Sequence, residues 1–349
     1  MAEREWLETY GGGNVMEKKR KRRVVILGIF LCLCAFCMPV SAASKLPRLQ
    51  VKGSRLVNSS GKNVQLRGVS THGLSWYPEY VNQSAFTFMK KNWKINAVRL
   101  AMYTAEYNGY CTGDEANRRK LETCIDNGVK YATNAGLYVI IDWHILSDGN
   151  PQQNQKQALK FFKKMAKKYK NNTNVIYEIC NEPNGGTSWK TVKRYAEKII
   201  KGIRTYDKKA VILVGTPTWS QDVDLAALSP ISKKYRKNVM YTLHFYAGTH
   251  GQWLRDKAQT ALDKGLPLFV SEFSICDASG NGNLNKKEAK KWLSFLDRNK
   301  ISYVAWSLSN KGESSAFIRS NCKKTGKWSS KNLTAAGKWI TNWYKKAGK

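Results

Sequence analysis

The chain has 349 residues, 42% of them hydrophobic, with 12 tryptophans, so it can bury a sizeable core and is not a disordered chain. Lysine and arginine number 59 against 25 aspartates and glutamates, which gives a formal net charge of +34. This charge would suit nucleic-acid binding, but the chain has no nucleic-acid-binding motif and its leader indicates export, so we expect no nucleic-acid partner.

Residues 1–42 are an N-terminal extension with the pattern of a signal peptide. A basic segment at 16–23 (MEKKRKRR) precedes an apolar run at 24–36 (VVILGIFLCLCAF), and cleavage would fit after Ala42. The apolar run is shorter than the roughly 20 residues of a spanning helix, which favours a cleaved signal peptide. A retained membrane anchor is the alternative. We therefore expect a protein that is secreted or held at the cell surface and meets a membrane only through this segment.

The cysteines give no sign of metal or redox chemistry. Three of the eight lie in the leader, and the other five show no CxxC spacing, so we expect no metal and no cofactor. An odd number leaves at least one thiol free, and Cys111 and Cys124 are near enough in sequence for a loop disulfide. The five cysteines outside the leader are Cys111, Cys124, Cys180, Cys276 and Cys322.

After the leader, residues 43–349 have the pattern of a single (β/α)8 domain, a TIM barrel. An alternating segment at 47–68 turns at 58–62 (NSSGK), which predicts a β-hairpin that closes the barrel bottom. Continuously apolar runs then alternate with amphipathic helical stretches, a pattern typical of parallel strands covered on both faces. The eight runs cover residues 64–70, 96–102, 137–144, 175–182, 210–216, 239–246, 267–274 and 303–310.

Polar and aromatic residues close these runs, at the end of the barrel where active sites lie. Glu182 and Glu272 follow the fourth and seventh strands and can face one another across the barrel mouth. A facing glutamate pair is the minimum machinery for glycoside hydrolysis, in which one residue protonates the leaving oxygen and the other attacks or activates water. The strand-end residues are His72, Arg99, Asp142, His144, Asn181, Glu182, Trp219, His244, Tyr246, Glu272 and Trp306.

Neighbouring residues can support such a pair. Arg99 can hold one carboxylate ionised, and the two-residue strand period places His244 and Tyr246 on one face. Trp306 can form the floor for a pyranose ring, with Trp76 and Trp219 extending it toward a polymer chain.

Some residues at these strand ends and elsewhere also have structural interpretations. Asp142 fits a core hydrogen-bonding role better than a catalytic one, and Arg99 could be only an ion-pair partner. Five tryptophans are interpreted as packing residues: Trp93, Trp189, Trp292, Trp328 and Trp339.

Motifs on the predicted strands resemble glycoside hydrolase family 5, and in particular its small bacterial secreted endo-β-1,4-glucanases. The resemblance runs from about Leu46 to Trp343. It implies a retaining double displacement on internal β-1,4 bonds of cellulose or other β-glucans, without a metal. The motifs are VRLAMYT (98–104), IIDWHILSDGNP (140–151), ICNEPNG (179–185), LHFYAGTHG (243–251), VSEFS (270–274) and WSLSNKGESSA (306–316).

The resemblance implies a role for each matching position. Glu182 would be the general acid/base, Glu272 the nucleophile, and Asn181 the residue that holds the 2-OH of the sugar at the reacting centre. Arg99 and Tyr246 would support the nucleophile, and His244 the acid/base. The remaining positions would line or shape the cleft: His72, Trp76, Tyr103, His144, Trp219, Trp306, Lys311 and Glu313.

Two other functions stay open on sequence grounds. A β-mannanase or xylanase would use the same catalytic residues, because specificity resides in loop contacts. A noncatalytic cell-surface polysaccharide-binding protein would need neither glutamate.

The basic charge fits solvated helix faces. Retention on an anionic cell wall or attraction to acidic plant polymers is the alternative explanation of the charge. We expect a β-glucan substrate and a monomer.

Overall fold

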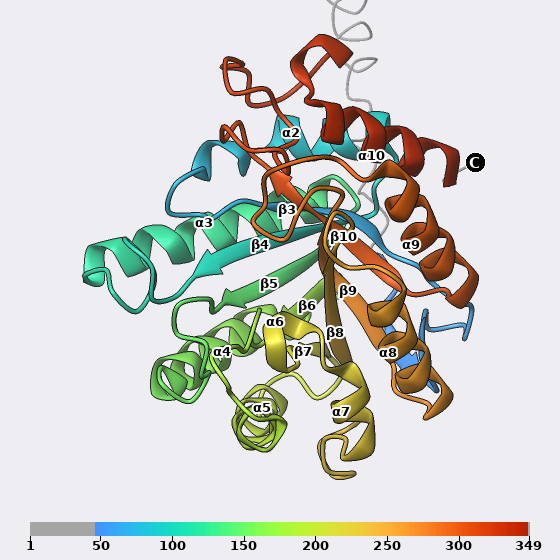
Figure 1. Ribbon diagram of the computed structural model, residues 1–349. Helices are drawn as coiled ribbons and strands as arrows, with labels where there is room; N and C mark the ends of the chain where they lie inside the picture. Colours follow the sequence, from blue (N-terminus) through green and yellow to red (C-terminus); the bar gives the residue numbers. More distant parts are fainter. Residues whose placement is uncertain (1–45, 348–349) are drawn as a thin grey trace, which may run out of the picture. The chain divides into compact units, whose positions relative to one another are not determined.

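Eight parallel strands close into a barrel in the computed structural model, which describes residues 46–347 (Figure 1). The predicted leader and its cleavage after Ala42 lie outside the described residues. The strands are β3 (Arg67–Thr71), β4 (Ala97–Tyr103), β5 (Tyr138–His144), β6 (Val175–Glu178), β7 (Val211–Val214), β8 (Val239–Tyr246), β9 (Leu268–Ser274) and β10 (Ser302–Leu308). Each strand pairs in parallel with the next in the chain, and β10 pairs with β3. This arrangement confirms the predicted (β/α)8 barrel.

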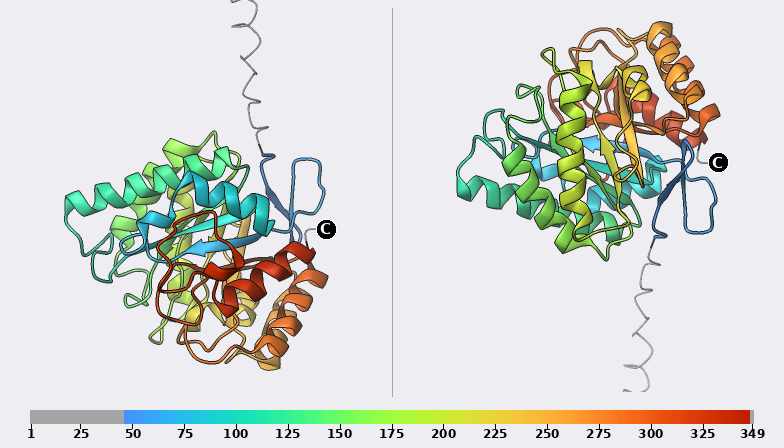
Figure 2. Two further views of the ribbon diagram at one scale, coloured as in Figure 1. Left: turned by 90° about the horizontal axis from the view of Figure 1, so that it is seen from above. Right: turned by 90° about the horizontal axis from the view of Figure 1, so that it is seen from below.

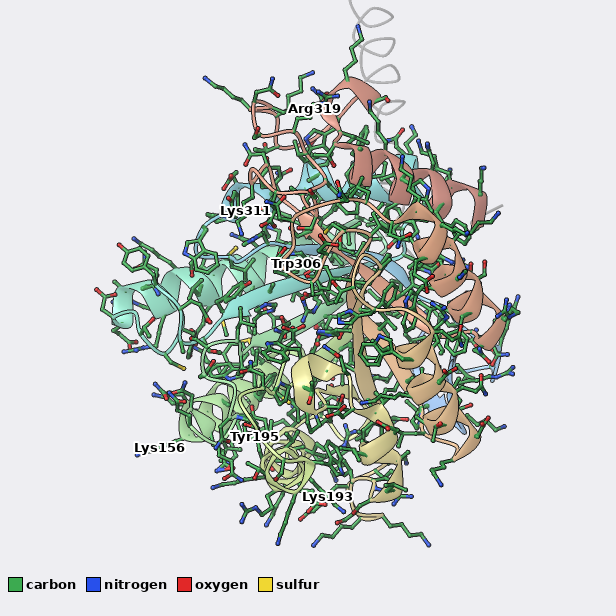
Figure 3. The ribbon with its side chains drawn as sticks, viewed as in Figure 1. Lys156, Lys193, Tyr195, Trp306, Lys311 and Arg319 are labelled. Atoms are coloured by element: carbon green, nitrogen blue, oxygen red, sulfur yellow. The ribbon has the colours of Figure 1, made fainter. Side chains whose placement is uncertain are left out.

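Helices cover the outside of the barrel because their apolar residues recur three and four positions apart. In α5, Val192, Tyr195, Ala196 and Ile199 are all buried, while the lysines lie on the opposite face. In Figure 3, Lys156 and Lys193 extend outward from α4 and α5. The helices are α2 (Gln83–Phe88), α3 (Glu115–Asn134), α4 (Gln155–Tyr169), α5 (Trp189–Arg204), α6 (Pro217–Ser220), α7 (Val223–Leu228), α8 (Gln252–Asp263), α9 (Lys286–Asn299) and α10 (Ala335–Ala347), with short helical turns η1 (Pro78–Tyr80), η2 (Met89–Trp93) and η3 (Ser330–Asn332).

A β-hairpin is present and lies at one end of the barrel, but its two strands are joined at 53–54 and not at the predicted turn of 58–62 (Figure 2). Its strands are β1 (Gln50–Lys52) and β2 (Arg55–Val57), and Leu49 and Leu56 pack into the same apolar cluster as the first inward residues of the barrel strands. The tight turn is at Gly53, where φ is +59°, and the NSSGK segment forms a second turn that leads to β3. Glycine adopts this positive φ without strain because it lacks a Cβ, so Gly53 favours the first turn.

The fourth strand is shorter than predicted. β6 ends at Glu178, so Glu182 lies in the loop that follows rather than at the end of a paired strand. The chain between them still bonds to its neighbours, because Ile179 N donates to Leu213 O and Asn181 N donates to Trp143 O. The ladder ends before Pro183, which has no N–H to donate.

The five tryptophans interpreted as packing residues are buried or partly buried, as predicted. Trp93, Trp189, Trp292 and Trp328 are buried, and Trp339 is partly buried against the core. The five cysteines at positions 111 to 322 are all free, so the loop disulfide between Cys111 and Cys124 is absent from the structure. Within residues 46–347, none of the helices has the length and apolar character needed to span a membrane.

Candidate active site

A β-bulge in β9 brings Glu272 into the barrel. Thr242 of β8 pairs with Phe269, but His244 pairs with Glu272, so β9 holds one extra residue between these pairs. Both Ser271 and Glu272 therefore point inward, where a regular two-residue period would have turned one of them out. Bulges often redirect a side chain beside an active site in this way.

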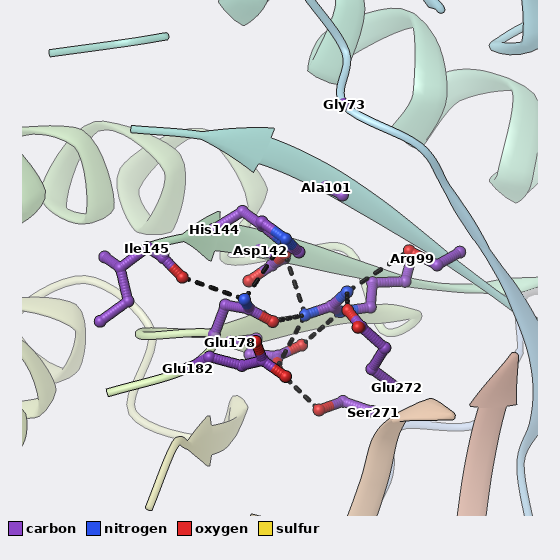
Figure 4. A network of polar contacts seen from close by, with 12 residues as sticks. Gly73, Arg99, Ala101, Asp142, His144, Ile145, Glu178, Glu182, Ser271 and Glu272 are labelled. Atoms are coloured by element: carbon purple, nitrogen blue, oxygen red, sulfur yellow. Dashed lines mark hydrogen bonds and ion pairs between the residues drawn. The ribbon is translucent and has the colours of Figure 1, made fainter. Parts of the chain in front are cut away.

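Arg99 organises a buried ionic network under the barrel mouth (Figure 4). Its guanidinium is fully buried and donates to Glu178 at 2.8 Å, to Glu272 at 3.0 Å and to the Asn181 side-chain oxygen at 2.7 Å. A third carboxylate, that of Asp142, lies 3.1 Å away. The planar fork of arginine suits several acceptors at once, which a lysine could not match.

The second oxygen of Glu272 is also held. Tyr246 donates its hydroxyl proton to Glu272 Oε1 at 2.8 Å, while Arg99 bonds Oε2. Both carboxylate oxygens thus have a fixed partner, and the side chain has one orientation at the cavity floor. Arg99 and Tyr246 thus both contact the carboxylate of Glu272.

His244 connects the two halves of the site. Its Nδ1 lies 2.9 Å from Glu182 Oε1, and its Nε2 lies 2.9 Å from Ser271 Oγ and 3.8 Å from Glu178. Burial alone would lower the pKa of His244, but the neighbouring Glu178 carboxylate, together with the hydrogen bond and the charge of Glu182, raises it to about 9. His244 is therefore an imidazolium at neutral pH.

The acids and histidines around Arg99 titrate far from their ordinary ranges. Although burial opposes it, the charge of Arg99 lowers the pKa of Glu178 to about 2. Burial raises the pKa of Asp142 well above its usual range, against the effect of Arg99. Burial and then the charge of Arg99 lower the pKa of His144 to about 3. A neutral His144 faces Asp142 at 2.6 Å, which fits the structural role expected of Asp142.

The loop that carries Glu182 is anchored on both sides. Tyr195 of α5 donates its hydroxyl to Ile179 O at 2.6 Å, and Asn184 donates to Leu146 O at 2.7 Å and to Glu182 O at 3.0 Å. Ser220 donates to Asn181 O at 2.7 Å. These bonds fix the backbone of Glu182 although it lies outside the sheet.

Glu182 and Glu272 form a close pair. One carboxylate oxygen of each, together with a ring nitrogen of His244, lie within 4.8 Å of one another. Retaining glycosidases hold their two carboxyl groups roughly 5 to 5.5 Å apart and inverting enzymes roughly 6.5 to 9.5 Å apart. The three donors could also be considered for a metal, but both nitrogens of His244 already have hydrogen-bond partners. The arrangement therefore fits proton transfer and nucleophilic attack.

A cavity of about 580 Å³ opens over this pair. Trp306 lies near the centre of the barrel and Lys311 at its rim (Figure 3). Lys311 contacts Glu313 at 2.6 Å, and His72 lies 3.8 Å from the same carboxylate. Of the predicted residues, the cavity is lined by His72, Tyr103, His144, Glu182, Trp219, His244, Tyr246, Glu272, Trp306, Lys311 and Glu313.

Three predicted residues lie behind the cavity lining. Arg99 and Asn181 are fully buried, and the Asn181 side-chain nitrogen donates to Ile145 O at 3.0 Å. Trp76 packs on the ring of Tyr103 at 4.6 Å and donates to Tyr107 O. Arg99 and Asn181 border Glu272 and Glu182 from below, while Trp76 extends the aromatic wall beyond Tyr103.

Sequence reasoning missed three residues of the site. Glu178 and Ser271 belong to the buried network, since Ser271 donates to Glu178 at 2.7 Å. His250 lines the cavity, and its Nδ1 accepts from Tyr246 N at 2.8 Å. Glu178 could have been found from the sequence because it is an acidic residue inside an otherwise apolar run. His250 could have been found because it is the one histidine that does not lie at a predicted strand end.

Comparisons with known proteins identify one family for this chain. The family model for cellulase (glycosyl hydrolase family 5) matches residues 57–312. Endoglucanase A of Butyrivibrio fibrisolvens is 47% identical over 294 residues, which cover 84% of this chain and 67% of that protein. Endoglucanase 5 of Pectobacterium carotovorum is 41% identical over 331 residues, which cover 93% of this chain and 64% of that protein.

Solved structures give the same result. The cellulase Cel5C_n superposes with a TM-score of 0.83 at 44% identity, covering 88% of this chain and 94% of that one. The catalytic domain of the Thermobifida fusca endoglucanase Cel5A, solved with cellotetraose, superposes with a TM-score of 0.80 at 35% identity, covering 88% and 99%.

The fold and the paired glutamates define a glycoside hydrolase. The chain belongs to glycoside hydrolase family 5. It spans about two thirds of the length of the curated relatives it matches.

Proposed function

We propose that this protein is a retaining endo-β-1,4-glucanase that cleaves internal bonds of cellulose or other β-glucans. The single observation that supports this most is the Glu182–Glu272 pair, in which one oxygen of each carboxylate lies within 4.8 Å of the other and the carboxylate of Glu272 is held by Arg99 and Tyr246. The relatives named endoglucanase or cellulase direct the choice of polymer toward β-glucan over mannan or xylan.

In the first step, Glu272 attacks the anomeric carbon and forms a glycosyl ester as the glycosidic C–O bond breaks. Glu182 donates its proton to the departing oxygen, which leaves as the alcohol of the shortened chain. Arg99 and Tyr246 orient the attacking carboxylate, so little reorganisation is needed at the moment of reaction.

In the second step, Glu182 accepts a proton from water while the water oxygen attacks the anomeric carbon. The ester bond breaks, Glu272 returns as a carboxylate, and the sugar keeps its original configuration. The imidazolium of His244, 2.9 Å from Glu182, stabilises the negative charge that Glu182 carries between the steps.

The walls of the cavity suit a chain of sugars. Trp306 is buried to 95% against His72 and His144, with ring centroids 5.0 and 5.2 Å away, and offers a firm floor for one pyranose. Trp219 is 46% exposed at another part of the lining and offers a second contact. Aromatic contacts spread along a cleft favour a polymer over a monosaccharide.

We further propose that the enzyme is exported by its N-terminal segment, that residues 43–349 form its catalytic domain, and that it works as a monomer. The pattern of residues 1–42 and the bacterial sources of the named relatives support export. The outward lysines of α4 and α5 support a solvated surface as the origin of the basic charge.

The test is reducing-sugar release by the purified protein on carboxymethyl-cellulose, barley β-glucan, β-mannan and xylan, with Glu272→Gln as control. Activity on the two glucans that is lost in the variant supports the proposal. Activity confined to mannan or xylan would keep the mechanism and overturn the substrate. An inactive wild-type protein that still binds the polymers would favour the binding-protein alternative.

A further inference from the structure

Two half-exposed tryptophans lie on one side of the cavity. Trp219 follows β7 and is 46% exposed, and Trp253 in the first turn of α8 is 47% exposed. Trp219 lines the cavity, whereas Trp253 packs edge-on against His250, a cavity-lining residue, with ring centroids 5.7 Å apart. Trp253 therefore borders the cavity without being used by the catalytic machinery described above.

The two tryptophans are tied to each other through a charged contact. Lys257, one turn along α8 from Trp253, bonds Asp222 at 2.6 Å, and Asp222 accepts from Thr218 at 2.7 Å. Lys257 Nζ also lies over the Trp253 ring at 5.9 Å. The start of α8 and the turn that carries Trp219 thus form one connected rim.

That turn is held in a costly conformation. Thr218, Trp219 and Ser220 have φ values of 57°, 54° and 58°, a left-handed run without glycine. Such residues persist only where surrounding contacts fix them, and they cluster at ligand sites. The contacts here are the bond from Thr218 to Asp222 and the bond from Ser220 to Asn181 O.

The rim is hydrogen-bonded to the loop that carries Glu182. Trp219 N donates to Pro183 O, and Ser220 donates to Asn181 O, so the turn is bonded to both neighbours of Glu182, the residue that protonates the leaving oxygen. The other wall, where Lys311 meets Glu313 and His72 packs on Trp306, belongs to a different group of loops.

We propose that Trp253 forms a distal subsite for the leaving-group part of the glucan, beyond Trp219. The inference rests on the proposed function and deepens it. The C–H face of a glucose ring packs on the open indole surface, while Lys257 and Asp222 provide polar partners for its hydroxyls. Only a chain that extends well past the cleaved bond reaches Trp253, so the subsite selects long β-glucans over short oligosaccharides.

The test compares Trp253→Ala with the wild type on cello-oligosaccharides of increasing length and on p-nitrophenyl β-cellobioside, whose leaving group is too short to reach Trp253. We expect kcat/KM to fall roughly three- to tenfold on the long oligosaccharides and to stay unchanged on the nitrophenyl substrate. Trp253→Phe should recover most of the loss, because it keeps an aromatic face. Tyr206→Ala, which removes an aromatic residue that is 39% exposed after α5, is the matched control.

Binding to the Glu272→Gln background, followed by calorimetry, gives a readout that does not depend on turnover. Adding Trp253→Ala should weaken the binding of a long oligosaccharide and leave that of cellobiose unchanged. Equal losses for all lengths would show that Trp253 only supports His250, and wild-type values at every length would exclude the subsite; either result overturns the inference and leaves the glucanase proposal standing. A wild-type protein inactive on all glucans would overturn both.

Discussion

The two ends of the barrel interior are filled by different chemistry on the same strands. At the end that the hairpin covers, the inward residues are apolar, among them Ile140, Leu213, Met240 and Phe269. One or two inward positions later the strands bear Arg99, Asp142, Glu178, His244 and Glu272, all buried. A single bulge in β9 separates Phe269 of the first layer from Glu272 of the second.

The apolar layer and the ionic layer contribute differently to stability and to activity. The apolar layer gains free energy from burial and dispersion, while each charge in the ionic layer must recover its lost hydration from a partner. A cluster of this kind is weak evidence for stability, so its presence is better explained by the reaction it serves. We therefore expect variants of the apolar layer to lower stability alone. Variants of the ionic layer should lower activity, and they should lower stability as well where a buried charge is left without its partner.

The largest effect on activity should come from Glu272→Gln. Glutamine keeps the shape, and its single carbonyl oxygen can still accept from Arg99 while its NH2 group faces the Tyr246 hydroxyl. It cannot attack the anomeric carbon, so kcat should fall roughly 10⁴-fold or more. The melting temperature should move by only a few degrees. Kinetics on barley β-glucan and a thermal melt would check both, and a variant with a tenth of the wild-type activity would contradict the assigned nucleophile.

Arg99→Met should damage both properties. It leaves the carboxylates of Glu178, Asp142 and Glu272 without their shared cation, at an expected loss of about 3–5 kcal/mol in the free energy of unfolding, together with most of the activity. Arg99→Lys keeps the positive charge but lacks the planar fork, so its stability and activity should lie between those of the wild type and of Arg99→Met. Denaturant unfolding measures the loss; a fully stable Arg99→Met would mean that the network does not depend on its cation.

Phe269→Ala, in the apolar layer of the same strand as Glu272, should affect stability alone. Removing a fully buried ring costs about 3–5 kcal/mol, because a cavity remains. The kcat of the folded fraction should stay within about twofold of wild type. A large fall in kcat at a temperature where the variant is folded would show that the two layers are not separable.

The smallest effect, a shift in pH dependence, comes from Glu178→Gln. The pKa of His244 is raised to about 9 partly by the neighbouring Glu178, so the titration of the His244 ring, followed by NMR, should have its midpoint near pH 9 in the wild type. The neutral amide removes that charge, and the midpoint should move to lower pH by about one unit or more. A midpoint that does not move would contradict the contribution of Glu178 to the pKa of His244.

The same shifts set the pH range of stability. Because the pKa of His244 is raised above 6.5, its contribution is complete below pH 6.5 and lost as pH rises through about 9. The pKa of His144 is lowered to about 3, so its contribution is complete above pH 6.5 and lost as pH falls toward 3. Unfolding free energies across this range should therefore be highest near neutral pH.

Much of this could be predicted from the sequence, because apolar runs and their polar ends carry strong signals. Glu182 and Glu272 stand out as acids at the ends of core strands. Glu178 was missed because it lies inside a run interpreted as wholly apolar. The inward turn of both Ser271 and Glu272 depends on a bulge that no local residue marks. The left-handed turn at Trp219 could not be predicted, because it contains no glycine, the residue that normally marks such a conformation.

The stereochemistry of the first product tests the central claim most directly. Proton NMR of a cello-oligosaccharide during the first minutes of hydrolysis distinguishes the β-anomer from the α-anomer before mutarotation mixes them. The account predicts the β-anomer, because Glu272 attacks from one face and water from the same face as the departed oxygen. Initial release of the α-anomer would contradict the double displacement and assign Glu272 to the activation of water.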